Sequence, residues 1–95
     1  MSTAYFIYIM TNKDNRVLYA GVTNNLLRRV NEHRDQSGSA FTRRYHVTKL
    51  VYYEIFDDPQ TAIAREKQIK AGSRRKKLDL VNSLNPDWND LAETL

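Results

Sequence analysis

Five polar side chains of this sequence have types and spacings that suit chemistry on a phosphodiester bond. Tyr8 and Tyr19 lie eleven residues apart, Arg29 follows ten residues later, and His33 stands four residues beyond it, with Glu66 far along the chain. Phosphodiester hydrolysis needs a base for the attacking water, neutralisation of the phosphate charge and help for the leaving oxygen. One carboxylate near phenols and a guanidinium also suits a hard divalent cation that takes its other ligands from water and phosphate oxygens.

The two tyrosines fall in segments that are expected to pair as a β-hairpin. If the loop has an even number of residues and is centred on Lys13 and Asp14, Tyr8 lies directly opposite Tyr19. A loop with an odd number of residues makes them diagonal neighbours. In both cases the two phenols share one patch of the sheet, and two core tyrosines with satisfied hydroxyls are the structural alternative.

The helix that begins at Leu26 carries two polar residues beside its apolar stripe. Leu26 and Val30 define the stripe, Arg29 and His33 border it one turn apart, and Arg28 points to the opposite side. A guanidinium beside the core is unusual unless an anion binds it. The alternatives are an arginine whose stem packs while its head reaches water, and a satisfied structural histidine.

Glu66 is placed within an apolar stripe rather than opposite it. With residues spaced at about 100° around the helix axis, Glu66 lies within about 60° of both Ala62 and Ile69. A buried or half-buried carboxylate needs a partner, a proton or a metal ion. Lys70, four residues on, offers an intrahelical ion pair as the structural alternative.

The surrounding pattern predicts an α+β fold, a small three-stranded antiparallel sheet flanked by helices in the order β-β-α-β-α-α. The helices are expected to be capped by Thr23 or Asn24, by Asp58 followed by Pro59, and by Ser73. One domain is expected over residues 1–95, with its core at 5–82 and a tail at 83–95 that forms a last short helix or frays. The expected strands are residues 5–10, 16–22 and 50–56, and the expected helices are residues 26–35, 59–71 and 74–84.

Composition and charge narrow the class of protein. The chain has no cysteine and two histidines, which excludes thiolate chemistry and disulfides and makes a zinc site a poor fit. No apolar run approaches the ~18 residues of a membrane span, and "MSTAYFIYIM" lacks the features of a signal peptide, so we expect a cytoplasmic protein without a membrane partner. Residues 28–77 hold 13 of the 15 basic and six of the 11 acidic residues. This distribution indicates a phosphate-binding surface, or simply a solvated basic one.

The spacing of the polar residues resembles that of the GIY-YIG nucleases, most closely their small single-domain bacterial branch, similar to the nuclease module of the excision-repair incision subunit. The resemblance covers residues 5 to 82. It rests on "FIY", which ends in Tyr8, on "YAG", which begins with Tyr19, and on Arg29, His33 and the glutamate of "AREKQIK". Two positions depart from the motifs. Phe6 replaces the first glycine and could narrow the approach of DNA, and Ala20 replaces an isoleucine.

The resemblance implies a role for each residue. Glu66 would hold one Mg²⁺ or Mn²⁺, Arg29 would neutralise the scissile phosphate, and Tyr8 or Tyr19, helped by His33, would activate water. A free phenol has a pKa near ~10, so the base needs assistance from its surroundings. DNA is the expected partner, with RNA as an alternative, and a protein partner would supply specificity because the chain has no room for a recognition domain. The expected phosphate contacts are Arg43, Arg44, Lys70, Arg74, Arg75 and Lys76.

Three functions are therefore in competition. The first is a metal-dependent endonuclease, serving DNA repair or recombination. The second is a non-catalytic nucleic-acid-binding module, and the third is a subunit or scaffold of a repair or mobile-element complex. The five polar residues favour the first, because a carboxylate beside the phosphate repels DNA unless a cation lies between them.

Overall fold

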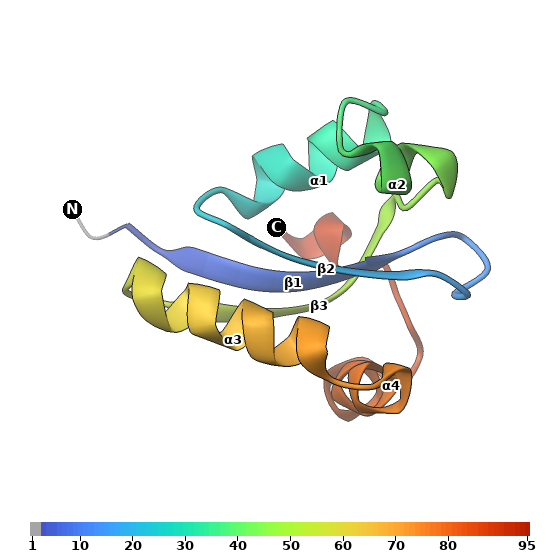
Figure 1. Cartoon of the computed structure of the whole chain (residues 1–95). Coiled ribbons are helices and arrows are strands. Elements are labelled where there is room, and N and C mark those ends of the chain that lie inside the picture. The colour runs from blue at the N-terminus through green and yellow to red at the C-terminus, as the bar shows by residue number, and fades with distance from the viewer. Residues whose placement is uncertain (1–2) are drawn as a thin grey trace.

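The computed structural model describes residues 3–95 and contains one antiparallel sheet with helices on both faces (Figure 1). The strand order is β2-β1-β3, so β1 is central and β2 and β3 are edge strands. The predicted α+β class and element order are confirmed. The strands are β1 (Tyr5–Thr11), β2 (Leu18–Thr23) and β3 (Lys49–Phe56), and the helices are α1 (Leu26–Arg34), α2 (Ala40–Arg44), α3 (Pro59–Ala71), α4 (Arg74–Leu84) and the 3-10 helix η1 (Leu91–Thr94).

Side-chain caps define where the helices begin. Asp58 and Ser73 accept hydrogen bonds from the third residue beyond them, as predicted. The predicted cap of α1 is wrong by one position, because Asn25 accepts from the Arg28 amide while Thr23 is still part of β2. The sequence pattern also missed α2, which has only five residues and is capped by Ser39. So short a helix has too few residues to show a period.

The predicted hairpin register is wrong. Tyr8 pairs with Gly21 instead of Tyr19, because the connection spans residues 12–17 and is centred one residue later than expected. Asn12 stabilises the connection in this position, since its side-chain oxygen accepts from the amides of Arg16 and Val17, at 2.8 and 3.1 Å. Tyr19 is therefore a diagonal neighbour of Tyr8 on the same face of the sheet.

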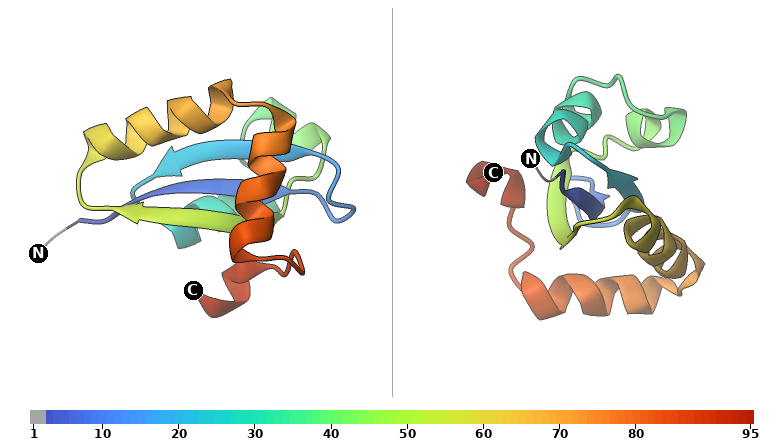
Figure 2. Two further views of the ribbon diagram at one scale, coloured as in Figure 1. Left: turned by 90° about the horizontal axis from the view of Figure 1, so that it is seen from below. Right: turned by 90° about the vertical axis from the view of Figure 1, so that its left-hand side faces the viewer.

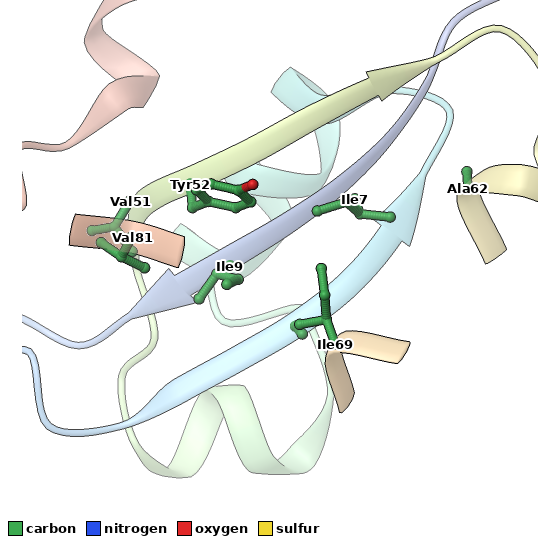
Figure 3. Close-up of a cluster of buried hydrophobic side chains, with 8 residues drawn as sticks. Ile7, Ile9, Val51, Tyr52, Ala62, Ile69 and Val81 are labelled. Carbon is green, nitrogen blue, oxygen red and sulfur yellow. The ribbon is translucent and has the colours of Figure 1, made fainter. Parts of the chain in front are cut away.

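The sheet separates two apolar clusters, one on each face. Ile7 and Ile9 of β1 pack toward α3 and α4, against Ala62, Ile69 and Val81 (Figure 3). The residues that alternate with them along β1, Tyr8 and Met10, belong to the other cluster, which contains Leu26 and Val30 of α1. Figure 1 shows α1 and α2 on one side of the sheet and α3 and α4 on the other.

A charged network attaches α3 to the edge strand β3. Arg65 donates to Glu54 through Nε at 3.0 Å and through Nη2 at 2.9 Å, and the Tyr52 hydroxyl donates to the same carboxylate. Burial alone would raise the pKa of Glu54, but the bonds from Arg65 and Tyr52 outweigh it and lower that pKa. The network holds α3 in the rotation about its own axis that turns Arg65 toward β3. Glu66, the next residue, therefore faces away from β3.

The C-terminal segment returns from α4 to the sheet. Figure 2 shows α4 crossing below the strands and the chain then passing β3 toward the side of α1. Asn85 is buried, and its side-chain amide donates to the carbonyls of Val51 and Asn89, at 3.1 and 2.8 Å. Asp90 accepts from the Leu50 amide and pairs with Arg34 of α1. Much of the segment that was expected to be a tail is therefore bonded to β3. No helix within residues 3–95 is long and apolar enough to cross a membrane.

Asn85→Ala should lower the free energy of unfolding by about 2–3 kcal/mol, because the substitution leaves the buried Val51 carbonyl without a partner. Urea unfolding measures the change. Ser83→Ala on the exposed side of α4 is the control and should alter stability by less than about 0.5 kcal/mol. A similar small effect at Asn85 would show that the C-terminal segment unfolds separately from the sheet.

Candidate active site

The centre of the site is a contact between Tyr8 on β1 and His33 on α1. The Tyr8 hydroxyl lies 3.3 Å from His33 Nε2, and Tyr8 is only 1% exposed. His33 is buried because it lies on the same inner face of α1 as Leu26 and Val30. This agrees with its predicted position beside the apolar stripe. The strand and the helix therefore meet through a phenol and an imidazole.

Two glycines make room for this pair. A Cβ atom at Gly21 would lie 2.4 Å from the Tyr8 hydroxyl oxygen, so only glycine leaves space for the phenol beneath β2. A Cβ atom at Gly38 would lie 3.1 Å from His33 Nδ1 and 2.8 Å from the Thr42 hydroxyl. The close approach of the Tyr8 phenol thus explains why the last residue of "YAG" is a glycine. The Ser/Gly loop after α1 covers the imidazole of His33.

Tyr19 lies at the open edge of β2, where the two layers of helices approach each other. Its ring centroid is 6.4 Å from that of Tyr8, 5.4 Å from that of His33 and 6.2 Å from that of Phe41 on α2. The Lys70 ammonium of α3 lies 5.8 Å from the Tyr19 centroid. Tyr19 therefore contacts elements from both faces of the sheet.

Arg29 is half-buried and incompletely paired. Its Nε lies 3.1 Å from a Glu32 carboxylate oxygen, close enough for an ion pair, yet among residues 3–95 this buried nitrogen has no hydrogen-bond partner. His33 Nδ1 is a second buried polar atom without a partner in the described chain. Buried groups in folded proteins are normally paired, so the partly exposed guanidinium of Arg29 marks a place where a ligand can complete the pairing.

Glu66 is half-buried and paired with Lys70. Its side chain is 15% exposed, and its carboxylate lies 3.5 Å from Lys70 Nζ. The ion pair that was the structural alternative is therefore present. Glu66 and Tyr19 belong to opposite faces of the sheet, and Lys70 connects them at the β2 edge because it touches both.

Burial sets the protonation of the central pair. Burial, reinforced by Tyr19, raises the pKa of Tyr8 well above its ordinary value, so its hydroxyl stays protonated. Burial and the neighbouring positive charge of Arg29 lower the pKa of His33, so the imidazole is neutral around pH 7. A neutral imidazole next to a protonated phenol can hold or pass on a proton, whereas a phenolate at Tyr8 is disfavoured.

The six basic residues that were predicted to contact phosphate do not share one face. Lys70 adjoins Tyr19, and Arg43 and Arg44 lie on the exposed side of α2, on the α1 side of the sheet. The other three open α4 below the sheet, as Figure 1 shows; they are Arg74, Arg75 and Lys76. Arg75 is also paired with Asp79. These basic residues therefore lie on both faces of the sheet.

Two residues beside the candidate site, Glu32 and Phe41, were not predicted from the sequence. Glu32 faces Arg29 at the i, i+3 spacing, a local signal that helical geometry could have revealed. Phe41 packs beside Tyr19 from α2, and its signal is the mixture of aromatic and basic residues in "FTRRYH".

Comparison with known proteins identifies the class. The GIY-YIG catalytic domain matches residues 4–79. The chain therefore belongs to the GIY-YIG family, whose domain is a nuclease domain, and the predicted resemblance to this family is confirmed.

The relatives define the group within that family. A UPF0213 protein from Clostridium perfringens is 41% identical over 78 residues, which cover 82% of this chain and 83% of the relative. One from Haloquadratum walsbyi is 38% identical over 80 residues, covering 84% and 89%. The solution NMR structure of a UPF0213 protein from Bacillus halodurans is 30% identical, covers 92% of each chain and has a TM-score of 0.58. These names state no reaction.

Gly21→Ala should destabilise the fold by about 1–3 kcal/mol, because the added methyl group displaces the Tyr8 phenol. Chemical denaturation measures the loss. Gly72→Ala is the comparison variant, since its new Cβ would lie 3.3 Å from a helix carbonyl, a tight contact but much milder than that at Gly21, and its loss of stability should be smaller. Equal losses in the two variants would contradict the close contact at Tyr8.

The lowered pKa of His33 predicts a pH-dependent stability. The unfolded imidazole takes up a proton near pH ~6.5, and the folded one does so only at lower pH. The unfolded state therefore binds more protons, and the free energy of unfolding should fall as the pH decreases below ~6.5, by at most ~1.4 kcal/mol per pH unit from this group.

NMR titration of the imidazole protons measures the pKa directly, and His46→Asn identifies the His33 signal. Urea unfolding between pH 5 and 8 then gives the stability, with His33→Phe expected to show a shallower pH dependence. A His33 signal that titrates above the ordinary histidine value would overturn the assignment of a neutral, buried imidazole.

Proposed function

We propose that this chain is a divalent-metal-dependent endonuclease that hydrolyses phosphodiester bonds of DNA. The observation that carries the proposal is a half-buried carboxylate, Glu66, held through Lys70 at the same strand edge as Tyr19. Across that edge lie the incompletely paired Arg29 and the buried pair of Tyr8 and His33. Membership of a nuclease family supports the reaction class.

The accessibility of the side chains suggests which role each residue has in the hydrolysis. Tyr19 lies at the β2 edge, so it is the phenol that would contact the attacking water. Tyr8 lies behind it, stays protonated and orients the neutral imidazole of His33, which can accept a proton. The Arg29 guanidinium would bind the scissile phosphate and neutralise the charge that develops during attack.

A metal ion would have a single carboxylate ligand from this chain. Within residues 3–95 no three side chains of His, Cys, Asp or Glu gather into a metal-binding group. Glu66 fits a Mg²⁺ or Mn²⁺ ion that keeps several waters and binds phosphate oxygens, because Mg²⁺ is often held by only one or two carboxylates. When bound, the ion would add positive charge beside the phosphate. Lys70 competes for the same carboxylate.

The ion pair of Glu66 and Lys70 favours a second candidate function. A carboxylate that is already neutralised by a lysine does not need a metal ion and does not repel DNA strongly. A nucleic-acid-binding module, alone or as a subunit of a repair complex, would have the same basic surface without cleavage.

Cleavage of supercoiled plasmid with Mg²⁺ or Mn²⁺ tests the proposal. Wild type should nick the plasmid, and Glu66→Gln and Arg29→Ala should each lose at least about 100-fold in rate, because each removes a charge that acts on the phosphate. Arg28→Ala is the matched control, since this arginine of α1 is exposed on the opposite face of the helix. A chelator should abolish the nicking.

Thermal unfolding should show that all variants are folded, and an RNA strand of the same sequence tests the choice of nucleic acid. Equal rates for wild type and Glu66→Gln would reject the role of the carboxylate. DNA binding without nicking, with Glu66→Gln binding as tightly or more tightly, would favour the binding module.

A further inference from the structure

A row of aromatic rings leads from the candidate active site onto the outer surface of α2. We infer that Phe41 and Tyr45 form a stacking platform for unpaired nucleobases, so that the strand presented to the site is single-stranded. This inference rests on the proposed function, because the platform adjoins the tyrosine that would contact the attacking water. It adds a class of substrate to that proposal.

The rings follow one another without interruption. The centroids of Tyr19 and Phe41 are 6.2 Å apart with an interplanar angle of 30°, a stacked arrangement. Phe41 on α2 and Tyr45, the residue that caps the C-terminus of this helix, have ring centroids 4.9 Å apart at an angle of 51°. The Arg44 guanidinium lies 5.4 Å from the Tyr45 centroid. The row therefore joins a surface cation to the β2 edge through three rings.

The outer two rings are exposed although the helix is anchored by another residue. Phe41 is 44% exposed and Tyr45 is 40% exposed, while the buried residue of α2 is Thr42, whose hydroxyl donates to the Ser39 carbonyl at 3.0 Å. Burial of a large aromatic ring is favourable, so two half-exposed rings side by side on five residues form an apolar surface that is typical of a binding site. Both rings therefore remain partly accessible to a ligand.

The charges around the platform identify the ligand. Arg43 and Arg44 are exposed beside the two rings, and Lys70 lies over Tyr19 at the inner end of the row. Aromatic rings that alternate with cations suit a nucleic-acid strand, because the bases stack on the rings while the phosphates contact the cations. The bases of a duplex are already stacked on each other and cannot use such a surface. The platform therefore selects unpaired nucleotides, in a free strand, a gap or a branch.

A binding measurement in a buffer with EDTA tests the platform separately from cleavage. The probe is a single-stranded DNA oligonucleotide with 2-aminopurine, whose fluorescence is quenched by stacking, and the competitor is a blunt duplex. Wild type should quench the probe. Phe41→Leu and Tyr45→Leu should remove most of the quenching and weaken single-strand binding roughly 5- to 100-fold, with duplex binding unchanged.

Two further variants keep the test specific. Phe41→Trp retains a stacking surface and should retain binding, and Ile63→Ala removes an equally exposed apolar side chain of α3 and should have no effect. The inference is overturned if wild type does not bind the single strand, if the leucine variants bind it as wild type does, or if they lose duplex binding equally. The binding measurement contains no metal ion and does not depend on cleavage. Failure of plasmid nicking would therefore reject the proposed nuclease without changing the outcome of the binding measurement.

Discussion

The candidate site depends on how Tyr8 packs against Gly21 across the β1–β2 ladder. The phenol occupies the space in which any other residue at position 21 would place its Cβ, and it reaches His33 of α1 from there. This contact joins the central strand, an edge strand and the first helix at one point. Since β3 holds β1 from its other side, a shift of β2 by a single residue would move Gly21 away from the phenol and turn Tyr19 to the opposite face.

The second constraint is that β2 forms an open edge of the sheet. A central strand would keep the residues of its two faces apart, but at an edge the helices above and below can approach each other. This is how Lys70 of α3, on one face, comes to lie over Tyr19 on the other, and how it holds Glu66 next to the edge. On the β3 side, the bonds from Arg65 to Glu54 keep α3 in the rotation that this arrangement requires.

The electrostatics of the site combine a neutral interior with a cationic surface. Burial keeps Tyr8 protonated and His33 uncharged, so neither brings a net charge into the core. The cations lie outside, at Arg29, at Lys70 and along α2. Two of them already have a carboxylate partner, Glu32 for Arg29 and Glu66 for Lys70. An incoming phosphate would therefore exchange partners within existing ion pairs rather than meet isolated charges, which limits the self-repulsion of the basic surface in its absence.

The sequence by itself determined the three strands, the three longer helices and most of the candidate residues. The periodicity of α1 placed His33 inside and Arg28 outside, the signals at Asp58, Pro59 and Ser73 set the starts of α3 and α4, and the stripe on α3 placed Glu66 at the boundary of the core. These features depend on contacts within a few residues, which local patterns record.

Tertiary structure decided the rest. The sheet register depends on how β1 pairs with β3 as well as with β2, and the position of α2 depends on Phe41 meeting Tyr19 from a distant part of the chain. The approach of Lys70 to Tyr19 and the contact of Tyr8 with His33 likewise follow from how separate layers of the fold meet near the β2 edge. Such contacts join residues that are far apart in sequence, and no local pattern specifies which of them will form.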